Sequence, residues 1–391
     1  LEQLQGRKAS LYFHIPFCSH KCGYCNLFSL QTNRTEYIAT YLDTLHRQAQ
    51  QLSPLTAGLT FDSFAIGGGT PLLLTVPQLE QLMATAALFG VHPSHAFTSV
   101  ETSPEYADRP RLNVLKKAGV SRVSIGIQSF QDEELKAIKR RPRQNTIYQA
   151  LDDIRQMDFP YFNIDLIYGI KGQTVESFLY SLEEALRFQP NELFIYPLYV
   201  RQGTGITERE PDDVCFRMYR AACKLLQAKG FLQTSMRRFI HHPSTDAEVS
   251  CGDEVMLSCG SGGRSYLGDL HYATRYTVCQ QCIAREIDEY MATTDFTVAR
   301  NGFILSAKEQ QQRFIIKNLM YYMGIDKAEY TRRFGEPLDR TPLFRQLAEQ
   351  YWIEETPERI RLTPEGLGYS DYIGQLFITP EIRQLMETYS Y

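Results

Sequence analysis

The feature that most constrains the fold is a regular alternation of strand-like and helix-like segments through the first 230 residues. Apolar runs typical of strands occur six times, and amphipathic stretches separate them, as where apolar side chains from Tyr37 to Leu52 form one helical stripe. The runs cover Leu11–Ile15, Phe61–Ile66, Ala96–Glu101, Arg122–Ile127, Tyr161–Tyr168 and Glu192–Leu198. Strands that alternate with helices in this way predict a parallel sheet with helices packed on it.

Three cysteines lie close together directly after the first of these strands. Cys18, Cys22 and Cys25 have the spacing C-x3-C-x2-C, and the next cysteine is Cys215. Thiolates in one short loop can each bind an iron of a [4Fe–4S] cluster, and such clusters usually have four cysteine ligands. Because no nearby residue is an obvious fourth ligand, the pattern predicts one iron that stays open to a substrate or cofactor, as in catalytic metal sites.

Other interpretations of the three cysteines are less favoured. A zinc loop more often has paired C-x2-C spacings. A disulfide framework needs an oxidising compartment, and the residues from Leu1 to Lys8 contain no apolar signal core. We therefore expect a reducing, cytoplasmic location in which the nine cysteines bind metal, take part in catalysis or pack in the core.

Charge and hydropathy exclude some classes of partner. Lys and Arg number 41 against 45 Asp and Glu, so the net charge of -4 gives no basic field to attract nucleic acid. No apolar run approaches the length of a membrane span. The composition agrees with a soluble enzyme and predicts neither a nucleic-acid nor a membrane partner.

Further motifs follow the cysteine loop in order along the chain. They are Gly67-Gly68-Gly69-Thr70-Pro71, Val100-Glu101-Thr102-Ser103-Pro104, Ser124-Ile125-Gly126-Ile127-Gln128-Ser129-Phe130 and Asn163-Ile164-Asp165-Leu166-Ile167-Tyr168-Gly169. With the cysteines, they resemble the radical S-adenosylmethionine (SAM) superfamily, and within it the branch of oxygen-independent coproporphyrinogen III oxidase and the heme chaperones. The likeness runs from about Tyr12 to Tyr199 and resumes near the C-terminus.

The resemblance implies an α/β fold, with a partial (β/α)6 radical SAM barrel followed by a smaller winged-helix-like domain. We expect the barrel and its [4Fe–4S] loop in residues 1–230, an irregular Cys- and Gly-rich connection with candidate substrate contacts in 231–301, and the C-terminal domain in 302–391. The last region has helical patterns and one hairpin pattern. The helices are expected near Glu309–Tyr322, Leu343–Tyr351 and after Pro364, and the hairpin at Ile353–Leu362.

The resemblance also implies a set of site residues, with Cys18, Cys22 and Cys25 as the cluster ligands. The cluster would reduce SAM to methionine and a 5′-deoxyadenosyl radical. Contacts to a first SAM are expected from Tyr12, Tyr24, Gly68, Gly69, Thr70 and Glu101. Contacts to a second SAM are expected from Gln128, Arg140, Asp165 and the backbone near Tyr199. Two structural alternatives stay open: Tyr12 as a core residue, and Arg140 and Asp165 as an ion pair.

Later segments suggest further sites. Cys279 and Cys282 have a chelating C-x2-C spacing, and with Cys251 and Cys259 they predict either a zinc site, an auxiliary cluster or separate core residues. Candidate substrate contacts lie in the glycine-rich stretch from Ser258 to Gly268, and at Arg237, Arg238, His241, His242, His271 and Tyr272. A loop packed under the C-terminal domain is the alternative.

Two functions from different classes fit these motifs. The first is a radical SAM enzyme that acts on a tetrapyrrole or another small molecule with an electron donor such as flavodoxin or ferredoxin; a two-SAM methyl or carbon transfer is favoured over hydrogen abstraction. The second is a heme carrier, with an axial ligand among His14, His20, His241, His242 and His271. Coproporphyrinogen decarboxylation is less expected, because Asn26-Leu27 stands where the oxidases have another cysteine.

Overall fold

The protein is described by a computed structural model that covers Gly6 and residues 8–91, 95–141, 143–241, 255–338 and 341–388. Its main sheet has, within these residues, twelve strands in the order β14-β13-β12-β11-β1-β4-β5-β6-β7-β8-β10-β9. Six neighbouring strands are parallel: β1 (Lys8–Ile15), β4 (Thr60–Gly68), β5 (Phe97–Thr102), β6 (Arg122–Gln128), β7 (Tyr161–Tyr168) and β8 (Glu192–Pro197). All six predicted strands are confirmed, and the open sheet matches the expected partial barrel.

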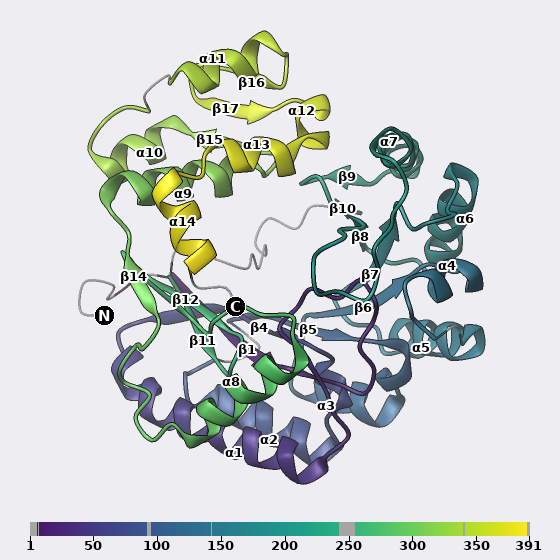
Figure 1. Ribbon diagram of the computed structural model, residues 1–391, viewed down its shortest axis with the longest axis vertical. Coiled ribbons are helices and arrows are strands. Elements are labelled where there is room, and N and C mark those ends of the chain that lie inside the picture. Colours follow the sequence, from purple (N-terminus) through teal and green to yellow (C-terminus); the bar gives the residue numbers. More distant parts are fainter. Residues whose placement is uncertain are drawn as a thin grey trace.

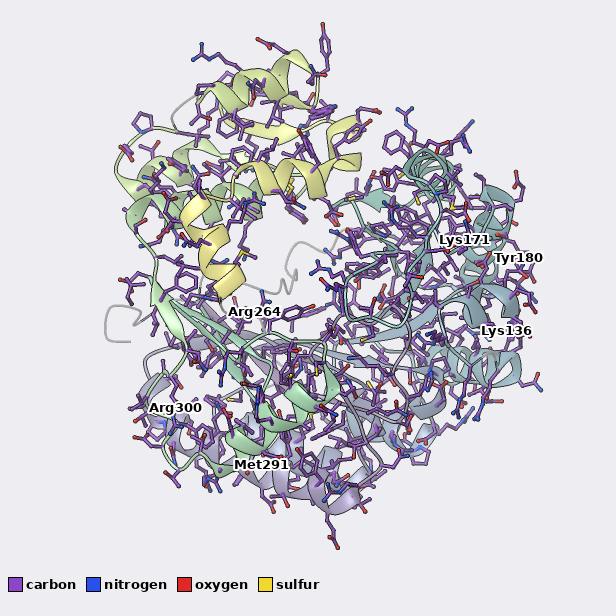
Figure 2. The ribbon with its side chains drawn as sticks, viewed as in Figure 1. Lys136, Lys171, Tyr180, Arg264, Met291 and Arg300 are labelled. Carbon is purple, nitrogen blue, oxygen red and sulfur yellow. The ribbon has the colours of Figure 1, made fainter. Side chains whose placement is uncertain are left out.

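Helices cover the outer face of this sheet, because each presents an apolar stripe to it (Figure 1). Figure 2 shows Lys136 and Tyr180 on the outside of this helical layer. The helices are α1 (Thr35–Leu52), α2 (Val76–Ala87), α3 (Arg109–Lys117), α4 (Asp132–Ala137), α5 (Gln144–Gln156), α6 (Val175–Leu186) and α7 (Asp212–Ala228), with the 3-10 turns η2 (Ser53–Thr56), η3 (Pro71–Leu73) and η4 (Pro104–Tyr106). These helices leave the carboxyl ends of the parallel strands available for a site.

The connecting segment is more regular than its sequence pattern indicated. Its strand β11 (Val255–Cys259) pairs in parallel with β1, and an antiparallel extension follows it. The described part of the segment also contains β9 (Leu232–Gln233), β10 (Arg238–Ile240), β12 (Arg264–Leu267), β13 (Leu270–Ala273) and α8 (Gln280–Ala292), and β14 (Gly302–Ile304) follows it. The prediction of an irregular connection was wrong, because short strands interrupted by glycines carry too little periodicity to be recognised.

The C-terminal region forms a second, smaller core around a three-stranded sheet. The predicted hairpin is present as β16 and β17, but three short helices replace the single last helix that we expected. The elements are α9 (Ala307–Leu319), β15 (Ile325–Asp326), α10 (Lys327–Phe334), α11 (Pro342–Glu349), β16 (Ile353–Glu355), β17 (Arg359–Leu362), α12 (Pro364–Gly368), α13 (Ser370–Leu376) and α14 (Pro380–Thr388). In the described part of the chain, no helix is both long and apolar enough to cross a membrane.

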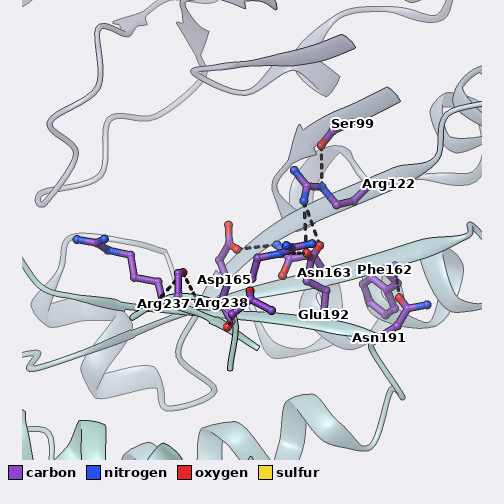
Figure 3. Close-up of polar contacts among 11 residues, drawn as sticks. Ser99, Arg122, Phe162, Asn163, Asp165, Asn191, Glu192, Arg237 and Arg238 are labelled. Atoms are coloured by element: carbon purple, nitrogen blue, oxygen red, sulfur yellow. Dashed lines mark hydrogen bonds and ion pairs between the residues drawn. The ribbon is translucent and has the colours of Figure 1, made fainter. Parts of the chain in front are cut away.

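A buried ion network joins neighbouring strands of the main sheet (Figure 3). Glu192 is fully buried and pairs with Arg122 at 3.3 Å and with the buried Arg238. Arg122 also donates to the Ser99 hydroxyl at 2.9 Å. A carboxylate that is fully buried needs such partners to be tolerated. Arg238, a candidate substrate contact, instead forms a structural ion pair with Glu192.

Candidate functional site

A cavity of about 850 Å³ lies at the carboxyl ends of the parallel strands. In barrel enzymes this end of the strands holds the active site. The predicted site residues that line it are Cys18, Cys22, Cys25, Tyr24, Gly68, Gly69, Thr70, Glu101, Gln128, Arg140, Asp165 and Tyr199. Residues almost two hundred positions apart in the sequence thus meet in one pocket.

The cysteine loop is held at the edge of this cavity by its own backbone pairing. The short strands β2 (Phe17–Cys18) and β3 (Leu30–Gln31) pair in parallel and bring the two ends of the loop together. Lys21 donates from Nζ to the Leu27 and Ser29 carbonyls at 3.1 and 2.9 Å. These contacts fix the loop independently of any bound group.

The cysteine arrangement suits a cluster better than a single metal ion. Among the residues that the structure describes, no three His, Cys, Asp or Glu side chains gather closely enough to hold one ion. A zinc ion requires its ligands around one centre, whereas in a [4Fe–4S] cluster each cysteine binds a different iron. Burial raises the pKa of Cys18 to about 11, and Thr70 Oγ1 contacts its sulfur at 3.6 Å. Because Cys18, Cys22 and Cys25 lie on one short loop and all line the same cavity, the residues present fit a [4Fe–4S] cluster.

The glycine run at the end of β4 approaches two other elements closely. A Cβ on Gly69 would lie 2.4 Å from the Phe17 carbonyl oxygen, and one on Gly67 would lie 2.8 Å from Glu101 Oε2. Gly68 has φ +117°, a conformation that side chains disfavour, and its N–H donates to Glu101 Oε2 at 3.3 Å. Only glycine fits this backbone between the cysteine loop and β5.

Two carboxylates open onto the cavity from neighbouring parts of the sheet. Glu101 ends β5 and Asp165 lies on β7, where Asn163 donates to Asp165 Oδ1 at 2.7 Å. Both line the cavity, where Glu101 is exposed and Asp165 is partly buried. Desolvation raises the pKa of Glu101, and desolvation with repulsion from Glu101 raises the pKa of Asp165 to about 7. A cation bound between them would be stabilised.

Gln128 and Arg140 form the wall beside these carboxylates. A register shift between Gly126 and Gln128 ends the regular pairing of β6 with β7, and Gln128 has φ +75°. Such strained residues cluster at functional sites. Arg140 donates to the Gly126 carbonyl at 2.6 Å and to the Tyr24 hydroxyl at 3.3 Å. Arg140 thereby joins β6 to the cysteine loop, and its observed partners do not include Asp165.

Tyr199 closes the cavity on the side of the C-terminal region. Its hydroxyl contacts Asp371 of α13, and Arg237 donates to the same hydroxyl at 2.6 Å and also pairs with Asp371. Arg237, a candidate substrate contact, is thus part of a link between the main sheet and the C-terminal core. A pocket residue is held by a segment more than 170 positions later in the chain.

Some predicted residues lie elsewhere. Tyr12 does not line the cavity; its hydroxyl donates to His14 Nδ1 at 3.0 Å, and His14 Nε2 donates to the Phe28 carbonyl at 2.9 Å. The stretch from Ser258 to Gly268 packs against β1 and also does not line it: a Cβ on Gly262 would lie 2.6 Å from His14 Nε2. These residues position β1 and have no contact with the cavity.

Sequence reasoning also missed several lining residues, including Ser103, Glu105, Tyr196, Arg141 and Arg143. A signal existed for the two arginines, because they continue the basic run that starts at Lys139. Exposed like charges in such a run are usually solvated, so only the position of the run beside the cavity reveals its role.

The later cysteines do not gather into a metal site within the described residues. Cys259 is buried in β11, while Cys279 and Cys282 lie at the start of α8 with Cys279 exposed. Cys251 lies outside the described residues, as does His242. Of the later cysteines that the structure describes, only Cys259 fits the interpretation as a buried core residue.

Comparison with known proteins identifies the family of this chain. Residues 12–185 match the model of the radical SAM superfamily, and residues 305–368 match the HemN C-terminal domain. An oxygen-independent coproporphyrinogen III oxidase from Salmonella typhimurium is 32% identical, over 92% of this chain and 83% of its own. This chain belongs to the radical SAM superfamily, in the group that contains these oxidases and heme chaperone HemW. Members of the superfamily bind a [4Fe–4S] cluster and SAM.

Two further relatives define the group. Heme chaperone HemW of Bacillus subtilis is 27% identical, over 94% of this radical SAM chain and all of its own. The structure of coproporphyrinogen III oxidase (HemN) from Escherichia coli superposes with a TM-score of 0.81 at 23% identity, covering 95% of this chain and 90% of that one. The fold is therefore shared throughout, while the relatives' names divide between an oxidase and a chaperone.

Proposed function

We propose that the protein is a radical SAM enzyme that reductively cleaves SAM in the cavity and acts on a tetrapyrrole or another small organic molecule. The observation that carries this proposal is the single cavity in which three cluster cysteines face the glycine run and the polar side chains of β5, β6 and β7. A [4Fe–4S] cluster with an open iron supplies the electron and the binding position for SAM.

The chain's own residues would bind and shield the cofactor. The backbone at Gly68 and Gly69 offers a close approach for the methionine part of SAM, since no side chain obstructs it. Glu101 would accept hydrogen bonds from hydroxyl or amine groups, and Tyr24 would pack beside the nucleoside. Bound cofactor and substrate would displace water from the part of the cavity that they fill.

We further propose that the cavity holds a second SAM, and that the reaction is a methyl or other carbon transfer. A volume of about 850 Å³ is near the top of the range of about 300–1,000 Å³ for small-molecule pockets. Arg140 would pair with a carboxylate through its planar guanidinium, and Asp165 would balance a sulfonium. Gln128, at the register shift of β6, lines the same cavity as these two charges.

The substrate is proposed to carry carboxylates. Four cations line the cavity, namely Lys21, Arg140, Arg141 and Arg143, and Arg141 and Arg143 are exposed. Arginine is suited to bidentate contact with carboxylates. Related proteins are named for coproporphyrinogen III, which fits this charge, and an acidic electron donor such as flavodoxin or ferredoxin would fit the same basic rim.

The test uses anaerobically reconstituted protein with dithionite and SAM. We expect 5′-deoxyadenosine from the wild type and none from Cys22→Ala. With a carboxylated tetrapyrrole as acceptor, S-adenosylhomocysteine formed in step with methylated product would support carbon transfer. A fully loaded protein that yields no 5′-deoxyadenosine would refute the enzyme proposal.

A heme carrier is the second candidate, and one observation favours it. His271 on β13 lies between the rings of Tyr266 and Phe303, at centroid distances of 4.4 and 4.9 Å. Neither ring nitrogen has a hydrogen-bond partner among the described residues, and desolvation lowers the pKa of His271 to about 4. A neutral imidazole without partners can bind iron once its neighbours move.

Heme titration separates the two candidates. A carrier is expected to bind one heme per chain with a Soret shift that His271→Ala removes, and to give little 5′-deoxyadenosine. His46→Ala, which changes a histidine bonded to the Thr85 hydroxyl at 3.0 Å, serves as control. Heme binding that is unchanged in His271→Ala would exclude this ligand.

A further inference from the structure

The first turn of α8 carries two cysteines that the radical SAM chemistry does not use. Cys279 is the N-cap residue of this 13-residue helix, and Cys282 follows one turn later. Cys279 is exposed and Cys282 is partly buried. Neither lines the cavity, and within the described residues no further His, Cys, Asp or Glu completes a metal site around them. Neither core packing nor metal binding accounts for the pair.

The two cysteines begin the same helical turn. Cys279 is the N-cap residue, with extended backbone at φ -69° and ψ 122°, and Cys282 is the third residue of the helix. Thr277 Oγ1 accepts from the Cys279 N–H at 3.1 Å and so fixes the residue that starts the helix. Cysteines three positions apart at a helix start are close enough for a disulfide with little movement of the backbone.

We propose that Cys279 and Cys282 form a redox-active dithiol that is oxidised to an intramolecular disulfide by small disulfides such as oxidised glutathione. The Cys279 thiolate attacks the small disulfide, forming a mixed disulfide and releasing one thiolate. The Cys282 thiol then loses its proton to solvent and attacks the Cys279 sulfur, which releases the second thiolate. In total, two protein thiols become one disulfide and one small disulfide becomes two thiols.

The surroundings assign the two cysteines different roles. The neighbouring Cys282, and to a lesser degree the charge of Arg285, lower the pKa of Cys279. Cys279 in turn raises the pKa of Cys282. A thiolate at a helix N-terminus is stabilised by the helix dipole as well. Cys279 is therefore the attacking sulfur and Cys282 the resolving one.

The position of this pair links it to the cysteine loop. Gln280, between the two cysteines, accepts from the Gln31 N–H at 2.8 Å and donates to the Ser29 carbonyl at 2.9 Å. Tyr276 donates to the Asn26 carbonyl at 2.7 Å. A disulfide draws the first turn of α8 together, so oxidation alters the element that holds the outer side of the cluster loop.

The experiment equilibrates the full-length, anaerobically reconstituted protein in glutathione redox buffers, alkylates it, and analyses the tryptic peptide from Tyr276 to Arg285, which contains both cysteines. We expect a single two-electron transition to a peptide two hydrogens lighter. A peptide that stays doubly alkylated across the series, or that carries only glutathione adducts, would overturn the proposal.

Variants test the assigned roles with the same peptide. Cys282→Ser is expected to stop at a glutathione adduct on Cys279, and Cys279→Ser to react at least about tenfold more slowly. Cys223→Ser, which changes a partly buried cysteine of α7, should leave the transition in place. Equal reactivity of Cys279 and Cys282 towards the alkylating agent would contradict the assignment. None of these outcomes depends on SAM cleavage, so the proposal can fail separately from the proposed function.

Discussion

The cysteine loop from Phe17 to Gln31 has two sides that are built differently. Its inner side lines the same cavity as Glu101 and Asp165, where desolvation raises the pKa of both carboxyl groups. Its outer side contacts the start of α8, where Cys279 is exposed and its pKa is lowered. The pKa values of ionisable side chains are therefore raised on one side of this loop and lowered on the other.

The two sides of the cysteine loop should therefore differ in how well they tolerate substitutions. On the inner side, glycines, charges and cysteines are in contact with one another, so one substitution disturbs several partners. On the outer side, solvent can replace a lost contact, and substitutions should change rates and redox behaviour without destroying the site. Substitutions on each side can test this comparison directly.

The largest difference should come from serine substitutions of one cysteine on each side. Cys25→Ser removes a cluster ligand, and we expect iron, sulfide and 5′-deoxyadenosine formation to fall by more than about tenfold, because remaining thiolates bind a cluster poorly. Cys282→Ser should leave iron content and basal turnover unchanged. Iron and sulfide analysis after reconstitution checks both. Equal iron loss in the two variants would show that the later pair also binds the cluster.

A second, large effect is expected from Gly126→Ala. The added Cβ would lie 2.5 Å from Gln128 Nε2, so the flexible amide must move away from its place on the cavity wall. We expect SAM affinity at the proposed second site to fall about tenfold, equivalent to about 1.4 kcal/mol, with cluster content unchanged. Equilibrium dialysis with labelled SAM measures this.

Gln128→Ala provides the matched test of that explanation. If Gly126→Ala acts by displacing the Gln128 side chain, the double variant should bind SAM no more weakly than either single variant. Additive losses would instead indicate that alanine at position 126 disturbs the backbone of β6 itself.

These residues also show how far sequence reasoning reaches. Strands β1 and β4 to β8 were predicted because long buried strands carry strong apolar patterns. The cysteine loop and the glycine run were predicted because each is a short motif whose residue types and spacing can be recognised within a few positions of the sequence. Tyr12 was assigned to the pocket by resemblance, but side-chain direction on β1 turns it towards His14. The link from Tyr199 to Asp371 depends on packing between distant segments, which leaves no local pattern in the sequence.

A moderate effect is expected from pH on the inner side. Asp165 has a pKa of about 7, so its ionised fraction rises between pH 6 and 8 and the affinity for a sulfonium should increase roughly tenfold over that interval. Asp165→Asn should bind SAM weakly with no such dependence. A wild-type affinity that falls as the pH rises would contradict a role for the carboxylate.

Protein stability gives an independent check of the same group. Because the folded pKa of Asp165 is raised from 3.8, the unfolded chain releases this proton first as the pH increases. Its contribution to the free energy of unfolding is therefore present below about pH 4 and is lost as the pH rises to about 7. The difference between wild type and Asp165→Asn in denaturant titrations should change across this interval and level off above it.

The smallest effect is expected on the outer side, from Gln280→Ala. The variant loses two hydrogen bonds to the loop, at Gln31 and Ser29, but water can reach the exposed Gln31 N–H in their place. A net loss of about 0.5–1.5 kcal/mol in local stability is expected, and we predict that a chelator removes iron about threefold faster. Gln281→Ala changes the exposed neighbour in the same turn and should behave as wild type. If Gln280→Ala abolished the cluster as Cys25→Ser does, the outer side would be as essential as the inner one and the distinction between them would not hold.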